Sequence, residues 1–198
     1  RAASLWTRVA SLTEEHIGDA DRALEAHRRV VDLVPDDIVA LDALARIQKE
    51  RGESAAASRW LERRLGVASD EERADVAMSL AETLLQAGRA QRACEVLEEA
   101  REGAPERADI RELLADEYRK QDTHGPLARV LADSAERAQG REEVLRYVRE
   151  AARLYRDEIG EPSAAIPVLR KARELAPDDR EIELMLAEGL RHAEEYDE

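Results

Sequence analysis

The feature that most constrains this chain is a segment near its start that recurs far along the sequence. The pattern A-x3-H-x7-P-D-D begins at Ala23 and returns as A-x3-L-x7-P-D-D at Ala165, 142 residues later, or four steps of about 35 residues. The same alanine position is found between them at Ala57 and Ala93. A fixed period of this length is typical of arrays in which each structural repeat packs on its neighbours.

Each period contains the signals of two amphipathic helices. Side chains that would share one helical stripe recur at i, i+3, i+4 and i+7, as in Leu41, Leu44, Ala45 and Gln48. A glycine near the middle of the period marks the end of the first helix, and a proline marks the end of the second. Ala, Leu, Glu and Arg, all strong helix formers, dominate, whereas Phe is absent and aromatic residues are 3%. This composition opposes a sandwich, a barrel or a doubly wound sheet.

These residues resemble the tetratricopeptide repeat (TPR), whose signature reads W-x2-L-G-x2-Y, then A-x3-F, then P. The best copies of its first half are Trp6-x2-Val9-Ala10-x2-Thr13, Ala77-x2-Leu80-Ala81-x2-Leu84 and Val148-x2-Ala151-Ala152-x2-Tyr155. Two departures stand out. The first and fifth copies carry an extra residue before the glycine, and the fourth copy is irregular from Asp122 to Pro126.

The resemblance implies an all-α fold, an α-solenoid of stacked antiparallel helix-turn-helix repeats in a right-handed superhelix. We expect residues 1–198 to form a single solenoid segment excised from a longer bacterial array. The repeats are expected at about 3–35, 36–69, 70–105, 106–139, 140–177 and, in part, 178–198. If the sixth repeat lacks its second helix, its apolar residues lose a partner, and copies could self-associate through such uncapped ends. The residues concerned are Ile182, Met185, Leu186 and Leu190.

Charge and sequence signals exclude several classes of protein. The net charge of −14 opposes nucleic-acid binding, because phosphate neutralisation needs a basic surface. The longest apolar runs are four residues, too short for membrane insertion. No leader precedes the first helix, which favours the cytoplasm, while a start at Arg1 rather than Met leaves the periplasm open. The lone Cys94 excludes an internal disulfide and a cysteine-based zinc site, and we expect a buried thiol.

No signature of catalysis is present, so we predict that the chain is not an enzyme and uses no cofactor. The four histidines, His16, His27, His124 and His192, are scattered. His27 falls at the position of the large second-helix residue of the repeat, where a packed side chain is favoured over a metal ligand. Asp122 and His124 could approach a metal together, but two ligands alone make a weak site. We therefore predict no metal site.

The family resemblance implies that first-helix residues outside the packing stripe line a concave groove for peptides. In the fourth copy these positions also include Asp109, Glu112, Asp116 and Arg119. The residues predicted to contact a peptide are Arg46, Lys49, Met78, Leu85, Leu113, Arg146, Arg149, Arg153 and Arg156.

Arg146, Arg149, Arg153 and Arg156 form a stripe on one helical face, which we call the arginine stripe. The planar guanidinium of arginine suits carboxylate recognition. We interpret the stripe as holding acidic groups of a peptide whose apolar residues rest on Met78, Leu85 and Leu113. The alternative is ordinary ion pairs along the helix. Glu142 and Glu150 would then pair with Arg146, and Asp157 with Arg153.

Three classes of function remain open at the level of sequence. A non-catalytic scaffold that binds a protein or peptide partner is favoured. A regulatory or sensor module of a larger enzyme or transcription regulator is the second. Binding of RNA by a related helical repeat is the third, and the acidic charge opposes it.

Overall fold

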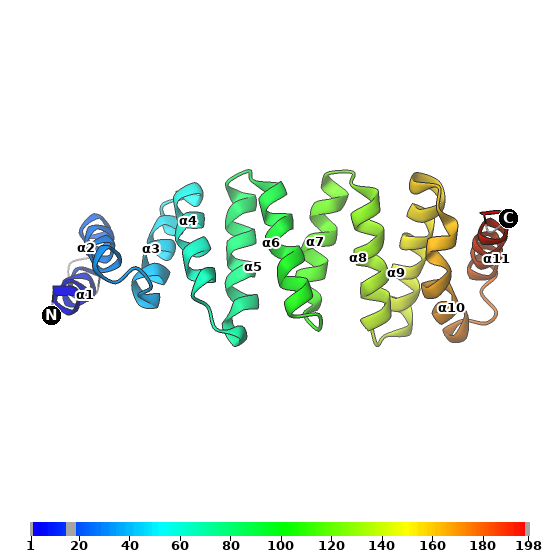
Figure 1. Cartoon of the computed structure of the whole chain (residues 1–198), viewed down its shortest axis with the longest axis horizontal. Helices are drawn as coiled ribbons and strands as arrows, with labels where there is room; N and C mark the ends of the chain where they lie inside the picture. The colour runs from blue at the N-terminus through cyan, green and yellow to red at the C-terminus, as the bar shows by residue number, and fades with distance from the viewer. Residues whose placement is uncertain (1, 15–18, 197–198) are drawn as a thin grey trace. The chain divides into compact units, whose positions relative to one another are not determined.

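The computed structural model describes residues 2–14 and 19–196, and within these ranges it contains helices and turns but no β-strand (Figure 1). The all-α fold predicted from sequence is therefore confirmed. The helices group into two compact units, Arg1–Ala104 (unit 1) and Pro105–Glu198 (unit 2). His16 and Gly18, which entered the sequence argument, lie outside the described residues.

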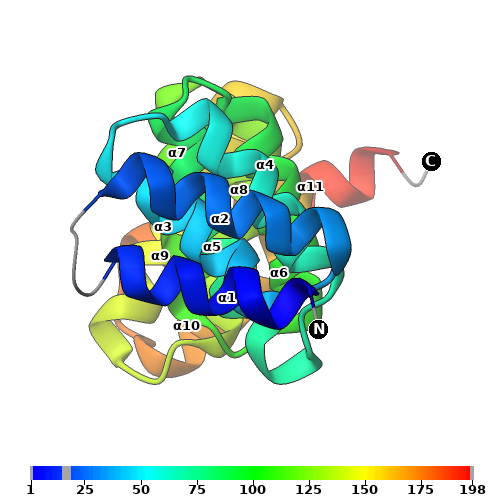
Figure 2. The same cartoon turned by 90° about the vertical axis from the view of Figure 1, so that its left-hand side faces the viewer.

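Unit 1 consists of three helical hairpins. Its helices are α1 (Ala2–Leu12), α2 (Ala20–Leu33), α3 (Ile38–Glu50), α4 (Ser54–Gly66), α5 (Asp70–Gln86) and α6 (Ala90–Gly103). Helices α1 and α2 lie side by side and antiparallel (Figure 2). Leu24, Leu41, Leu44 and Ile47 belong to one buried cluster, and Trp60 packs against it from α4. The periodic apolar residues of the sequence thus form the contacts between consecutive helices.

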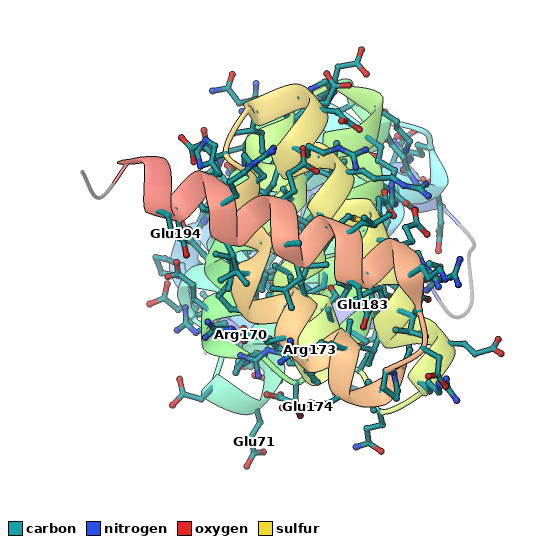
Figure 3. The ribbon with its side chains drawn as sticks, turned by 90° about the vertical axis from the view of Figure 1, so that its right-hand side faces the viewer. Glu71, Arg170, Arg173, Glu174, Glu183 and Glu194 are labelled. Atoms are coloured by element: carbon teal, nitrogen blue, oxygen red, sulfur yellow. The ribbon has the colours of Figure 1, made fainter. Side chains whose placement is uncertain are left out.

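Unit 2 repeats this arrangement with one irregular helix pair. Its elements are α7 (Ala108–Lys120), α8 (His124–Arg137), α9 (Arg141–Arg153), the π-helix η2 (Leu154–Ile159), the 3-10 helix η3 (Pro162–Ala165), α10 (Ile166–Leu175) and α11 (Arg180–Tyr196). Ile110, Leu114, Leu131 and Leu169 are fully buried in it. Figure 3 shows α11 lying across α10, with which it is in contact.

The turns inside the second and third hairpins follow one hydrogen-bonding scheme. In the second hairpin, Gly52 has φ 73°, its N–H bonds the carbonyl of Lys49 at 2.9 Å, and the N–H of Glu53 bonds the carbonyl of Gln48 at 2.8 Å. Gly88 takes the same position with φ 71°. This paired arrangement is the Schellman motif, in which the left-handed residue is usually glycine.

The fourth copy, irregular in sequence, uses the same turn. Asp122 replaces the glycine with φ 51°, and the N–H of Thr123 bonds the carbonyl of Tyr118 at 3.0 Å. Counted from this turn, Leu127 takes the place of the recurrent alanine and is buried. Aspartate tolerates the left-handed region better than most residues, which explains how the turn forms without glycine.

The extra residue of the fifth copy is absorbed by η2. Helix α9 continues into this π-helix, and Gly160 then adopts a left-handed φ of 77°. Thr13 and Glu14, near the extra residue of the first copy, also have π-helical geometry. A π-turn holds one more residue than an α-turn, so the insertion changes the helix locally.

The expected loss of an apolar partner in the last helix is wrong for three of the four residues named, and self-association through this end stays a prediction. Ile182, Met185 and Leu186 are buried, because α11 packs against α10 and η3, while Leu190 is 37% exposed. Gly189 lets α11 approach closely: a Cβ built there would lie 2.9 Å from the carbonyl oxygen of Pro162. The sequence analysis expected these residues to be exposed because the second helix of the sixth repeat is missing. It did not consider that the preceding repeat could cover them. That residues 1–198 form one segment of a longer array stays a prediction.

Candidate functional site

The arginine stripe lies on the surface of α9 and its π-helical extension. Arg146, Arg149 and Arg153 line one open cavity of about 450 Å³ together with Glu150 and Leu154. Arg156 does not line this cavity. The structure therefore brings together three of the four arginines that the sequence placed on one face.

Most of these guanidiniums are already paired with carboxylates. Arg149 donates a hydrogen bond to Asp179, at the start of α11, and its Nε lies 3.2 Å from Glu181 Oε2. Arg153 donates to the same Glu181 at 2.5 Å. The stripe thus links the first helices of two consecutive repeats.

The remaining ion pairs are not the ones that the sequence alternative named. Arg156 pairs with its neighbour Asp157 at 2.6 Å. Glu150 accepts hydrogen bonds from Arg119 of α7, at 2.7 and 3.0 Å. Arg146 lies over the ring of Tyr147, 4.8 Å from its centroid, and its side chain is 66% exposed. Its nearest carboxylate is Glu143 at 4.0 Å, so Arg146 is the arginine of the stripe with the weakest charge pairing.

The ion pair between Arg149 on α9 and Asp179, at the start of α11, also contributes to a shift in the pKa of Asp179. Burial of Asp179 favours its neutral form, but the hydrogen bonds from Arg149 and from the backbone N–H of Ile182 outweigh this effect. The pKa of Asp179 is consequently lower than its ordinary value of 3.8. The hydrogen bond to Glu150 likewise raises the pKa of Arg119.

A second cavity, of about 330 Å³, lies between α7 and α9. Arg111, Arg119, Arg146, Tyr147 and Glu150 are among its lining residues. Burial raises the pKa of the Tyr147 hydroxyl, which lies 3.4 Å from Glu143 Oε1. The cavity therefore combines guanidinium groups, carboxylates and an aromatic ring on the first-helix face.

Arg111 is the functional candidate that sequence reasoning missed. It is 5% exposed, its Nη1 donates to the carbonyl of Pro105, and its Nε has no hydrogen-bond partner. Within the described residues no carboxylate lies at ion-pair distance from it. The signal was available in the sequence, because Arg111, Leu114, Ala115 and Tyr118 follow the stripe spacing with a cation at an apolar position.

In unit 1 the predicted peptide-contacting residues are separate positions on α3 and α5. Arg46 pairs with Glu14 and with Glu50, the latter at 3.1 Å, and Lys49 donates to Ser79 at 3.3 Å. Met78 and Leu85 on α5 are half-buried. In unit 2, Leu113 on α7 is also half-buried.

The described histidines, His27, His124 and His192, form no common site. His27 is buried, as predicted, and its Nε2 lies 2.5 Å from Glu14 Oε1. His124 Nδ1 lies 3.4 Å from Glu158. Among the described residues, no group of three or more His, Cys, Asp or Glu side chains is placed to hold a metal ion. Cys94 is buried on α6, as expected.

Comparison with solved structures supports this architecture. A TPR repeats protein from Bacteroides fragilis matches with a TM-score of 0.62 and 11% identity, covering 96% of this chain and 98% of that one. MamA matches with a TM-score of 0.54 and 17% identity, over 91% and 94% of the two chains. YrrB, described as a TPR protein with an unusual peptide-binding site, matches with a TM-score of 0.53 and 16% identity, over 94% and 90%. The sequence has no significant match among curated proteins.

The fold and these matches define the class: an α-solenoid of helix-turn-helix repeats. The tetratricopeptide repeat family matches residues 40–75, which contain most of α3, all of α4 and the start of α5. The chain therefore contains a match to the tetratricopeptide repeat and is similar in fold to TPR proteins along most of its length. This similarity supports a general role as a protein-interaction scaffold. None of the helices in the described ranges has the length and apolar character needed to cross a bilayer.

Proposed function

We propose that the first-helix face of unit 2 binds a segment of a partner protein, in the cleft between α7 and α9. The observation that carries the proposal is the position of Arg111: a buried guanidinium with no counter-charge among the described residues lines this cleft. A buried charge is costly unless it is paired. A carboxylate of a bound peptide would supply the missing charge and a hydrogen-bond acceptor.

Neighbouring groups favour a peptide as the ligand. Arg146 is exposed on the same cleft beside the ring of Tyr147, so an acidic and an apolar side chain could bind side by side. Leu113 adds a half-buried apolar contact on α7. Because Arg149 and Arg153 are held by Asp179 and Glu181, we assign them a supporting role at the edge of the site. Arg46, Lys49, Met78 and Leu85 remain proposed contacts of unit 1.

Selection of peptides from a displayed random library on the immobilised chain tests this function. We expect enriched peptides to carry Asp or Glu, and the Arg146→Glu variant to weaken their binding at least about tenfold, the effect of one lost charge-assisted hydrogen bond. Arg111→Met should produce a comparable loss.

Arg170→Glu is the matched control, because Arg170 is exposed on the second helix α10 (Figure 3) and the charge change is identical. The affinity of the Arg170→Glu variant for the selected peptides should stay within about twofold of that of the unmodified chain. Peptides that are equally insensitive to Arg146→Glu and Arg111→Met would place the binding face elsewhere.

A further inference from the structure

A cluster of arginines surrounds a cavity in unit 1, on a different set of helices. The cavity has a volume of about 340 Å³ and is lined by Arg28 of α2, Gln48 of α3, and Ala56, Arg59, Trp60 and Arg63 of α4. Helix α3 packs against both α2 and α4, so Gln48 reaches the cavity from the helix between them. No carboxylate of the described residues lines this cavity, in a chain whose net charge is −14.

Among the described residues, the three guanidiniums have no acidic partner. Arg63 donates to the carbonyl of Pro35 at 2.8 Å and lies 5.3 Å from the centroid of the Trp60 ring. Within the part of the chain that the structure describes, no carboxylate lies at ion-pair distance from Arg28, Arg59 or Arg63. All three residues are exposed, and like charges around one cavity favour the binding of an anion.

The acidic residues nearby are engaged by other arginines. Glu25 and Asp32 of α2 both pair with Arg29, at 3.1 and 3.8 Å. Glu62 of α4 lies 3.8 Å from Arg92 of α6. The charge of the cluster is therefore left for a ligand.

Gln48 gives an independent sign of an incomplete site. Its side chain is 2% exposed, and its Nε2 donates to Glu53 at 3.4 Å. Its Oε1 is buried and accepts no hydrogen bond from any described residue. A buried acceptor of this kind costs free energy unless a donor reaches it, and a peptide N–H is such a donor.

We infer that this cavity is a second interaction site, which binds an acidic segment of a partner protein. Carboxylates of the segment pair with Arg28, Arg59 and Arg63, and an adjacent apolar side chain rests on Ala56 and the Trp60 ring. A protein segment fits better than a nucleic acid, because the basic patch is limited to one cavity of an acidic chain. The site lies on α2, α3 and α4 and does not depend on the cleft between α7 and α9.

Fluorescence anisotropy with a labelled twelve-residue peptide of alternating Glu and Leu tests the inference. Saturable binding should weaken at least about tenfold in the Arg28→Gln/Arg59→Gln variant, since two charge-assisted hydrogen bonds are lost. The Arg29→Gln/Arg92→Gln variant removes the same charge from paired arginines and should bind within about twofold of the unmodified chain. In a Trp6→Phe background, the peptide should also change the emission of Trp60.

Three outcomes would overturn the inference. One is equal weakening by both double variants, which would indicate general electrostatic attraction. Another is unchanged binding when Gln replaces every Glu of the peptide. The third is tighter binding of a twelve-nucleotide oligothymidine than of the acidic peptide. Arg111→Met leaves this site intact, so failure here and failure of the cleft between α7 and α9 are distinguishable.

Discussion

Two arginines, one in each unit, are buried at positions where other repeats carry small or apolar residues. Counted from the left-handed turn residue, the position of Arg64 is held in other copies by Ala100, Ser134 and Ala172, which are all buried. The position of Arg111 is held by Leu41 and Ala77 and, with the extra residue of the fifth copy allowed for, by Val148, which are also buried. The two arginines are 3% and 5% exposed, so burial alone does not distinguish them.

Their counter-charges do distinguish them. Arg64 Nε lies 3.1 Å from Asp42 Oδ1, and its Nη2 lies 2.9 Å from Glu72 Oε1, so one guanidinium joins α3, α4 and α5. Among the described residues, Arg111 has only the carbonyl of Pro105 as a hydrogen-bond partner. The same residue type in the same degree of burial is thus a structural link in unit 1 and an unsatisfied group in unit 2. A buried arginine indicates function only when its charge has no partner.

Replacement of the paired arginine should have the largest effect on stability. Arg64→Met is expected to lower the free energy of unfolding by about 2 kcal/mol, less than for a fully buried pair because Asp42 and Glu72 stay half-exposed and rehydrate. Both tryptophans of the chain lie in unit 1, so urea unfolding followed by Trp60 emission in a Trp6→Phe background reports on it. The surface variant Arg92→Met should change stability by no more than about 0.5 kcal/mol. Equal losses in the two variants would contradict the structural role of Arg64.

The unpaired arginine should behave in the opposite way. Arg111→Met is expected to leave stability unchanged or to raise it by about 1 kcal/mol, since an apolar side chain replaces a charge without a partner. Hydrogen exchange of the amides of α7 and α8 measures the change within unit 2. A loss as large as that of Arg64→Met would show that the hydrogen bond to Pro105 holds the helices together.

The hairpin turns of the two units also differ, because Asp122 holds in unit 2 the left-handed position that Gly88 holds in unit 1. Asp122→Gly in unit 2 should stabilise the chain by about 0.5 kcal/mol, because glycine adopts a positive φ without steric cost. Gly88→Asp in unit 1 should destabilise it by about 1 kcal/mol for the same reason. Thermal unfolding of both variants checks the two signs. Destabilisation by Asp122→Gly would mean that the Asp122 side chain makes an essential contact.

The smallest effect concerns the titration of Glu72 beside Arg64. Its pKa is lowered from 4.5, first by the hydrogen bonds from the side chain and backbone of Ser69 and only then by Arg64. Because the folded-state pKa is depressed, this contribution to stability is complete above pH 4.5 and is lost as the pH falls through the folded-state value. Carboxyl carbon NMR should therefore find a larger upward shift of this pKa in Ser69→Ala than in Arg64→Met. The reverse order would make the ion pair the main cause.

Sequence periodicity predicts the helices well because the apolar stripe and the turn glycines are local signals. The interval from Ala93 to Pro105 corresponds to α6 and the start of the next repeat. The fourth copy shows where this reasoning stops. Asp122 makes a glycine-type turn and Leu127 replaces the small alanine, two substitutions that a residue pattern does not anticipate.

The candidate sites were less predictable than the helices. Spacing placed Arg149 and Arg153 on one face, but it could not show that Asp179 and Glu181, about thirty residues later, neutralise them. The sequence analysis did not select Arg111, because its position in the repeat is one of those that pack against neighbouring helices. Arg28 and Arg59 escaped notice because second helices were treated only as support. In each instance the deciding quantity is the distance to a counter-charge on another helix.

The π-helix η2 determines how a repeat of this kind can vary in length. An added residue in an ordinary helix would rotate everything after it by about 100° and turn the next apolar stripe away from the core. Here the N–H of Glu161 still reaches the carbonyl of Tyr155 at 2.8 Å, and Val168 and Leu169 of α10 are buried. The end of the first helix is therefore a position where an insertion needs no compensating deletion. Repeats in one array can drift in length there during evolution while their packing surfaces stay matched.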